Sequence, residues 1–240
     1  MDQTHQYPGR DLEAMSFAVN YHEWILQTFE PHLGQCVVEV GAGTGSFSEM
    51  LLTRNMQKLA LVEPSQEMFS RLRENILAIN TAVEVSLYQG TFATIAKDVS
   101  SHHPDSIIYV NVLEHVEDDE RELKLIYETL ETKGRLFVFV PAMEFLYGSL
   151  DAEIGHFRRY QKRDLVEKIQ RAGFSTLLCR YFDIVGVTPW WINYRLLKSK
   201  KMSPSVVSFY DRYVVPPARK IESLVRLPVG KNLILVAQKT

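Results

Sequence analysis

Three glycines at alternate positions, Gly41, Gly43 and Gly45, follow the run Val37–Val40. The run is rich in β-branched residues and is typical of a buried strand, and the residues after Gly45 have helical spacing. A strand, a glycine turn and a helix start together form a cradle for a phosphate or a nucleoside. A dinucleotide fingerprint has its third glycine five positions after the first, where this chain has Ser46. The spacing therefore argues against a nicotinamide dinucleotide.

Two acids flank this turn. Glu39 lies two residues before Gly41, and Glu63 ends a second apolar run, 59–62. A carboxylate at Glu39 disfavours a pyrophosphate and suits the ammonium of an amino acid, although a structural role in capping nearby amides stays open. An acid at the position of Glu63 accepts hydrogen bonds from ribose hydroxyls. A ribose that carries an amino acid and no pyrophosphate describes S-adenosylmethionine.

The chain at this point resembles the class I S-adenosylmethionine-dependent methyltransferases. The resemblance runs in order through five segments, 37–47, 61–65, 88–92, 105–116 and 134–141. It implies an α/β fold of the Rossmann-like, doubly wound type, with a seven-stranded, mostly parallel sheet and an antiparallel edge strand. It also implies methyl transfer from S-adenosylmethionine, with S-adenosylhomocysteine as the product.

The resemblance extends the set of donor-binding residues. Thr91 stands where family members often have an acid that reaches the adenine amine, so it either contacts adenine or caps a helix. Phe92 packs either on the adenine or in the core. The predicted cofactor-binding residues are Glu39, Gly41, Gly43, Gly45, Glu63, Pro64, Thr91, Phe92, Asn111, Val112 and Leu113.

The segment from Asn111 to His115 follows the fourth predicted strand. It resembles a segment of ubiquinone-type O-methyltransferases in which two acids and a histidine can bind a divalent metal. Asn111 replaces the first acid, and a hard cation prefers charged oxygens, so we expect no metal. His115 is a candidate general base near neutral pH, or it braces the loop together with Glu114. The predicted catalytic residues are His115, Glu114 and His156.

The acceptor side is expected in two segments. Residues 151–160 contain a Gly-His pair, two arginines and a tyrosine, which suit an anionic or polar acceptor or else hold a helix entry through Arg–Asp pairs. They resemble a bacterial branch linked to glycan and natural-product pathways. Residues 20–24 lie on a helix that commonly closes over the donor in this family, although His22 could instead be solvated. The predicted substrate-binding residues are Tyr21, His22, Arg158, Arg159, Tyr160 and Trp190.

Strands and helices alternate along the chain. Strands are predicted near 36–40, 58–62, 82–88, 106–110, 135–140, 174–182 and 232–239, and helices over 12–29 and near 45–54, 65–78, 118–131 and 162–172. This alternation predicts a mostly parallel sheet with helices on both faces, whose ligand crevice lies at the carboxyl ends of the strands. All of the motifs described above fall at those ends.

We interpret residues 1–240 as one methyltransferase domain. It comprises an N-terminal lid region (1–35), a core (36–182 and 232–240) and an aromatic-rich insert (183–231). Three roles for the insert stay open. It caps the acceptor pocket, it forms a subunit interface, or its tryptophans and neighbouring cations lie on an anionic membrane surface.

Composition limits the remaining classes of function. The net charge of −2 and the absence of a basic stripe argue against a nucleic-acid partner. Two cysteines in apolar contexts, a polar N-terminus and no long apolar run predict a cytoplasmic protein without a disulfide. The leading hypothesis is methyl transfer to an O or N atom of a small-molecule acceptor, a natural product or a sugar-containing intermediate. The alternatives are a donor-binding cyclase or scaffold of the same fold and, less favoured, an NAD-dependent oxidoreductase.

Overall fold

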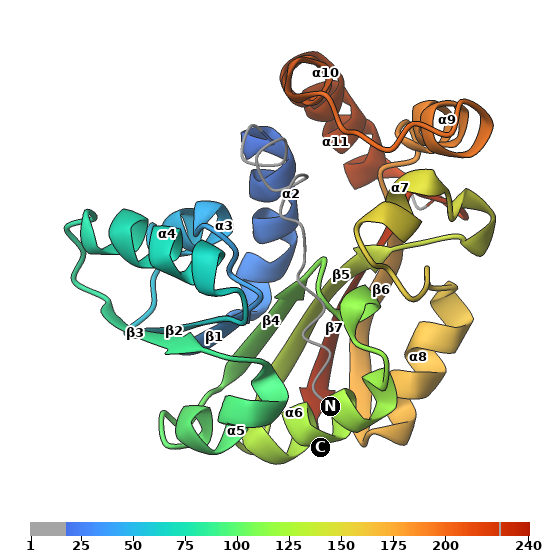
Figure 1. Cartoon of the computed structure of the whole chain (residues 1–240). Coiled ribbons are helices and arrows are strands. Elements are labelled where there is room, and N and C mark those ends of the chain that lie inside the picture. Colours follow the sequence, from blue (N-terminus) through green and yellow to red (C-terminus); the bar gives the residue numbers. More distant parts are fainter. Residues whose placement is uncertain (1–17, 226) are drawn as a thin grey trace, which may run out of the picture.

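Seven strands form one sheet in the order β3-β2-β1-β4-β5-β7-β6 (Figure 1). The computed structural model describes residues 18–225 and 227–240. The strands are β1 (Cys36–Val40), β2 (Lys58–Glu63), β3 (Glu84–Gln89), β4 (Ser106–Val110), β5 (Arg135–Pro141), β6 (Phe174–Phe182) and β7 (Asn232–Lys239). The seven predicted strands are confirmed, with ends that differ by at most two residues.

Six strands run in one direction and β7 runs against them. β1 pairs in parallel with β2 and β4, and β7 pairs antiparallel with both β5 and β6. β7 therefore lies one position in from the edge, and β6 is the edge strand. This mixed, mostly parallel sheet confirms the predicted fold class.

Helices cover both faces of the sheet (Figure 1). One face packs against α2 (Val19–Phe29), α3 (Ser46–Leu51), α4 (Gln66–Leu77) and α11 (Val215–Leu224), and the other against α5 (Phe92–Ser100), α6 (Asp119–Thr129) and α8 (Lys162–Arg171). Neighbouring strand residues point to opposite faces, so Val37 packs in the first layer and Val38 in the second. Each layer excludes water from one side of the sheet and fixes the strand ends in space.

Local sequence signals explain several helix ends. The Ser65 side chain accepts a hydrogen bond from the Met68 amide at the start of α4, and Asp118 caps α6 through the Arg121 amide. Helix α5 was not predicted. Its first residue, Phe92, is also the last residue of the 88–92 motif, which was interpreted as part of the donor site. The predicted helix 12–29 is described from Val19 onward, and its earlier part lies outside the described residues.

Shorter helical segments connect these layers at the carboxyl ends of the strands. They are η1 (Glu30–His32), η2 (Leu113–His115), η3 (Glu144–Leu146), α7 (Ser149–Glu153), α9 (Val187–Trp190), η4 (Trp191–Leu196), α10 (Pro204–Phe209) and η5 (Tyr210–Val214). In the insert, η4 continues α9 directly, and α10, η5 and α11 form one continuous helical stretch. These two arms project from the end of the sheet at which β1 and β4 finish (Figure 1).

The insert packs on the core of the sheet rather than forming a core of its own. Val215 and Ala218 of α11 are buried in the same cluster as Ile25 and Phe29 of α2. The buried side chains of α11 therefore extend the apolar layer that α2 begins. Within the two described ranges, none of the helices combines the length and the apolar character that crossing a bilayer requires.

Candidate active site

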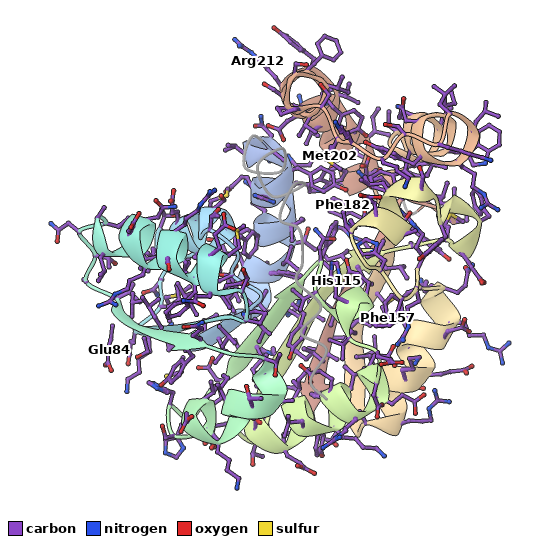
Figure 2. All side chains as sticks on the ribbon, viewed as in Figure 1. Glu84, His115, Phe157, Phe182, Met202 and Arg212 are labelled. Atoms are coloured by element: carbon purple, nitrogen blue, oxygen red, sulfur yellow. The ribbon has the colours of Figure 1, made fainter. Side chains whose placement is uncertain are left out.

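A single cleft of about 2190 Å³ lies at the carboxyl ends of β1, β2, β4 and β5. Its walls come from the glycine turn, the start of α5, the segment after β4, the 152–159 segment, helix α2 and the insert. Ligand pockets usually measure about 300–1,000 Å³. This cleft is large enough for two ligands side by side. Figure 2 places His115 near the strand ends and Met202 above it on the insert.

The glycine turn brings backbone rather than side chains to the cleft. Gly41 has φ 74° and Gly43 has φ 58°, both in the left-handed region that favours glycine. A Cβ atom on Gly41 would lie 2.3 Å from Cγ2 of Val112, so the turn and the segment after β4 approach as closely as glycine allows. Both residues line the cleft, as predicted.

Gly45 has a different role from the one predicted. It has φ 96°, precedes α3, and would place a Cβ atom 3.0 Å from Cδ1 of Leu72. It does not line the cleft. Gly45 therefore serves the close packing of the turn on α4 rather than ligand contact.

Glu63 lies at the end of β2 and lines the cleft. Its two oxygens accept hydrogen bonds from the amides of Gly43 (2.8 Å) and Ser65 (2.8 Å). Burial raises the pKa of this carboxyl. The carboxylate holds the glycine turn in place, and each oxygen keeps a further lone pair that a hydroxyl donor can use.

Glu39 is buried at the end of β1 and also lines the cleft. The hydroxyl of Ser48 donates to its Oε2 at 2.6 Å. Burial raises the pKa of Glu39 to about 8, so this acid is largely protonated at neutral pH. A cationic group in the cleft would favour its ionised form.

The other predicted donor-binding residues divide into two groups. Pro64, Thr91, Asn111 and Val112 line the cleft, and so does the ring of Phe92, which also packs edge-on against Tyr109. Thr91 stands at the N-cap position of α5, but its side chain accepts no hydrogen bond from the first amides of that helix, so the helix-cap alternative was wrong. Leu113 does not line the cleft, because its side chain is fully buried in the core.

His156 and Asp151 form a buried pair on the acceptor side of the cleft. Nδ1 of His156 lies 2.8 Å from Oδ1 of Asp151. Burial opposes ionisation of Asp151, but the hydrogen bond from His156 and the nearby Arg159 guanidinium lower its pKa below the ordinary value. An ionised carboxylate only accepts hydrogen bonds, so Nδ1 of His156 donates to Asp151, and Nε2 is the ring nitrogen that remains for proton exchange.

Glu114 lies behind His156 rather than in the cleft wall. Its side chain is fully buried, and its Oε1 lies 3.8 Å from Nε2 of His156. Neither carboxyl oxygen has a hydrogen-bond partner in the described structure. Burial raises the pKa of Glu114 to about 7. This arrangement supplies negative charge beside His156 when that ring gains a proton.

His115 lines the cleft and packs edge-on against His156, with ring centroids 4.6 Å apart. Burial, together with the neighbouring His156, lowers the pKa of His115 to about 3, and a hydrogen bond to the Gly155 backbone only partly offsets this. This low pKa argues against the predicted role of His115 as a base near neutral pH and favours the alternative in which it braces the loop. A ring with so low a pKa stays neutral and shapes the cleft wall.

Glu114, His115 and His156 are also the described residues that could hold a metal ion. One ligand atom from each of them lies within 4.8 Å of the others. Asn111 has φ 54° and lines the cleft nearby, where a second acid would have strengthened such a site. The donor set is therefore one carboxyl and two imidazoles.

Arg158 and Tyr160 do not reach the cleft, contrary to prediction. Arg158 pairs with Asp119 at 2.9 Å, and the hydroxyl of Tyr160 donates to the same carboxylate at 2.9 Å. Lys168 of α8 adds a third contact to Asp119 at 2.6 Å. These residues tie the 151–160 segment to α6 and α8, which is the alternative in which Arg–Asp pairs hold a helix entry.

Arg159 does line the cleft, as predicted, but it is not free to bind an anion. Its Nε donates to Asp151 at 2.9 Å, and its guanidinium carbon lies 4.8 Å from the ring centroid of Trp190. Trp190 therefore stacks on the buried cation and also lines the cleft. Together the two residues form a flat wall beside His156.

Helix α2 brings Tyr21 and His22 to the cleft. Burial lowers the pKa of His22 to about 4, and its ring packs edge-on against Phe47, so the solvated alternative was wrong. Trp24 on the same helix stacks on Phe182 with centroids 3.9 Å apart, inside the core. Helix α2 therefore offers two aromatic side chains to the cleft.

Asp183 is a buried junction that the sequence analysis missed. Its carboxylate accepts hydrogen bonds from the hydroxyls of Tyr21 (3.1 Å) and Tyr210, and Lys231 pairs with it at 3.0 Å. Lys231 and the adjacent Asn232 both line the cleft. The junction joins α2, the insert and β7, which are distant in sequence.

Three comparisons with known proteins agree with this geometry. The family model described as a methyltransferase domain matches residues 14–178. An uncharacterized methyltransferase of Anoxybacillus flavithermus is 27% identical over 157 residues, which cover 65% of this chain and 70% of the relative.

Two solved structures share the fold. One is a Thermotoga maritima protein described as an S-adenosylmethionine-dependent methyltransferase, possible histamine N-methyltransferase (TM-score 0.59, 19% identity, 95% of this chain and 94% of that chain). The other is the [4+2]-cyclase SpnF (TM-score 0.61, 16% identity, 92% of this chain and 80% of that chain). At these identities the likeness shows the fold alone.

Proposed function

The chain belongs to the S-adenosylmethionine-dependent methyltransferases, and we propose that it methylates an O or N atom of a small-molecule acceptor held beside His156. The observation that supports this most strongly is the continuity of one cleft. The same cavity is lined by Gly41 and Glu63 at one end and by His156 and Trp190 at the other. Donor and acceptor can therefore meet without crossing protein.

The donor would lie along the ends of β1, β2 and β4. Glu39 would receive the ammonium of the amino-acid part, and Glu63 would accept hydrogen bonds from the ribose hydroxyls. The glycine turn would allow the amino-acid part to approach the backbone closely, since no Cβ stands there. Thr91 and Phe92 at the start of α5 would border the adenine.

The reaction needs one bond exchange and one proton transfer. The acceptor atom attacks the methyl carbon in line, the carbon–sulfur bond breaks, and its electron pair stays on sulfur to give S-adenosylhomocysteine. Nε2 of His156 would accept the proton of the acceptor, and Asp151 and Glu114 would stabilise the imidazolium. Holding the two reactants in line can supply about 7–11 kcal/mol of the barrier reduction.

The cleft wall near His156 suggests the shape of the acceptor. Trp190 and Tyr21 offer aromatic surfaces, and Lys231 and Asn232 add polar groups beside these same rings, with Nζ of Lys231 4.9 Å from the Tyr21 centroid and 5.4 Å from the Trp190 centroid. A ring system that carries hydroxyl or amino groups matches both. We therefore favour a natural product or a sugar-containing intermediate as the acceptor.

Methyl-labelled S-adenosylmethionine tests this proposal. The protein is incubated with the labelled donor and a small-molecule extract, and both the label and S-adenosylhomocysteine are measured. We expect equal amounts of labelled product and S-adenosylhomocysteine from the wild type, and neither from Gly43→Val, which fills the turn. Chemical change of an extract component without S-adenosylhomocysteine would instead identify a cyclase, and donor binding without any turnover would favour a scaffold.

A further inference from the structure

The outward surface of the insert combines exposed apolar side chains with cations. Ten of the sixteen large apolar side chains that are exposed in the described chain lie in 187–225. Monomeric soluble proteins seldom gather exposed apolar groups in this way unless the surface contacts something. The insert therefore has an outer face that the monomer leaves uncovered.

The stretch α10–η5–α11 shows this outer face most clearly. Val207, Asp211, Val215, Ala218 and Glu222 recur at helical spacing on the side that packs on the core or is partly buried. A second stripe recurs on the opposite side, and its side chains are exposed: Phe209, Tyr213, Ile221 and Leu224. An ordinary surface helix has only one apolar stripe. The second stripe is unexplained by packing within the chain.

The arm formed by α9 and η4 adds to the same outer face. Trp191, Leu196 and Leu197 are exposed there, and both arms project from the cleft end of the molecule (Figure 1). Figure 2 shows Arg212 pointing away from the sheet at the extremity of the second arm.

The charges of the insert are strongly one-sided. Residues 187–225 contain seven lysines and arginines against two acids, although the whole chain has a net charge of −2. Both acids face inward. Asp211 accepts from the amides of Asn20 and Tyr21, and Glu222 accepts from the amides of Asp183 and Ile184. Among the cations, Lys200 pairs with Glu153 at 3.3 Å, outside the insert.

We propose that this outer face docks on an anionic membrane surface. Apolar side chains interleaved with lysine and arginine are the pattern by which interfacial helices insert between lipid headgroups, and the cations add attraction to anionic lipids. A second copy of this chain would meet the same cations and be repelled, so the charge favours the bilayer over self-association. An anionic bilayer offers phosphate groups to the cations and hydrocarbon to the apolar side chains, a combination that a neutral or acidic protein partner lacks.

The position of the face explains what docking would achieve. The opposite sides of the same helices, including Val207 and Tyr210, line the cleft. A docked molecule would therefore open its cleft close to the bilayer. On the proposed function, this arrangement would give the enzyme access to an acceptor that carries a lipid tail.

Vesicle sedimentation tests the docking. Full-length protein is mixed with phosphatidylcholine vesicles that contain phosphatidylglycerol at about one lipid in three, or none. We expect binding to the anionic vesicles that weakens as salt is raised. The double variant Leu197→Glu/Phe209→Glu should lower the bound fraction about tenfold or more, because it replaces two apolar side chains that would insert between the headgroups. These side chains are 67% and 62% exposed, so their replacement should leave the folded core intact.

Matched controls separate docking from general effects. Leu77→Glu changes an apolar side chain that is 69% exposed on α4, far from the insert in sequence, and should bind like the wild type. Lys198→Gln/Lys201→Gln should lose most of the preference for anionic lipid. Unchanged melting temperature and donor affinity confirm that the variants fold.

Two outcomes would overturn the proposal. One is no binding to anionic vesicles, or equal loss in the insert variant and in Leu77→Glu. The other is a dimer in sedimentation velocity that Leu197→Glu/Phe209→Glu dissociates, with no vesicle binding, which would assign the face to a subunit interface. The vesicle assay contains neither donor nor acceptor, so its failure leaves the proposed methyl transfer untouched.

Discussion

Nδ1 of His156 lies 2.8 Å from Oδ1 of Asp151, inside the protein and at the wall of the cleft. The carboxylate fixes which ring nitrogen carries the proton, and so leaves Nε2 as the acceptor. His115 is next to this pair but has a pKa lowered by burial to about 3. The two histidines therefore differ in chemistry although their rings touch.

Turnover should distinguish the two rings. With an acceptor that requires deprotonation, His156→Ala should lower kcat by about 10²–10⁴, the usual contribution of a general base, while the donor Kd stays within about twofold. His115→Ala should cost much less, because a ring whose pKa burial lowers to about 3 is too weak a base to hold the proton of the acceptor. His156→Gln controls for lost volume. Equal losses of kcat and donor affinity in both alanine variants would instead support a bracing role.

Donor binding should depend on pH through Glu39. Its pKa is raised by burial to about 8, and an ammonium nearby would favour the ionised form, so binding would release a proton. Calorimetry should show tighter donor binding from pH 6 to 8, with a dependence on buffer ionisation enthalpy. Glu39→Gln keeps an acceptor for Ser48 and should lose this dependence. A pH-independent wild-type Kd would contradict the role given to Glu39.

The same substitution should affect stability in the opposite sense. A carboxyl whose folded pKa is raised contributes stability that is full below the unfolded pKa and is lost as pH rises through the folded value. The ligand-free wild type should therefore lose stability between about pH 5 and 8 relative to Glu39→Gln. Thermal unfolding of both proteins across this range checks the sign. A parallel pair of curves would show that Glu39 ionises normally.

The contact of Gly41 with Val112 should be measurable as a coupling. Gly41→Ala places a methyl group 2.3 Å from Cγ2 of Val112 and forces alanine to φ 74°. We expect the donor Kd to rise about tenfold or more, equivalent to about 1.4 kcal/mol. Val112→Ala opens the space and should recover part of that loss in the double variant. Fully additive effects would show that the two side chains do not meet.

Among the acids with no proposed role in donor binding or proton transfer, Asp183 should contribute most to the free energy of unfolding. Burial alone would raise the pKa of Asp183. Lys231 and the hydroxyl of Tyr210 lower it by more, so the pKa lies below its ordinary value and the folded carboxyl is ionised. Asp183→Ala should cost about 3 kcal/mol, because it leaves the partly buried Lys231 without its ion pair and the hydroxyls of Tyr21 and Tyr210 without their shared acceptor. This contribution is present above the unfolded pKa and is lost as pH falls through the folded value. Urea unfolding measures it, with Glu167→Ala, on the exposed face of α8, as the neutral control.

Turnover should not require a divalent ion. The cluster of Glu114, His115 and His156 offers one carboxyl, whose pKa burial raises to about 7, and Asn111 supplies no second charge. Dialysis against a strong chelator should leave kcat unchanged, and added zinc, manganese or magnesium should not raise it. Loss of activity that one of these metals restores would assign the cluster to metal binding instead.

The sequence predicted the sheet and the donor end well for a physical reason. Short β-branched runs such as 37–40 and 106–110 are bounded by turn residues, and their spacing fits strand–helix alternation. The glycine turn and Glu63 act through local backbone geometry, which sequence spacing directly encodes. The sequence did not predict helix α5, because the first residue of this helix belongs to a motif that was interpreted as donor-binding.

The acceptor end was less predictable because its contacts are distant in sequence. In the 156–160 segment, His156 and Arg159 face Asp151, whereas Arg158 and Tyr160 face Asp119. No period in the sequence distinguishes these directions in an irregular segment. Asp183 likewise gains its role from partners in α2, η5 and β7. Burial, rather than residue type, decided that His115 is a poor base.

An experimental structure with S-adenosylhomocysteine bound would test the central claim most directly, through the distance from its sulfur to Nε2 of His156. The account places the amino-acid part at Glu39, the ribose at Glu63, and an acceptor atom between the sulfur and His156. With reacting atoms about 3–3.5 Å apart at each contact and a methyl group to transfer, it predicts a separation of about 6–8 Å. A sulfur atom that points away from His156, or lies well beyond this distance with the 151–160 segment ordered, would contradict it.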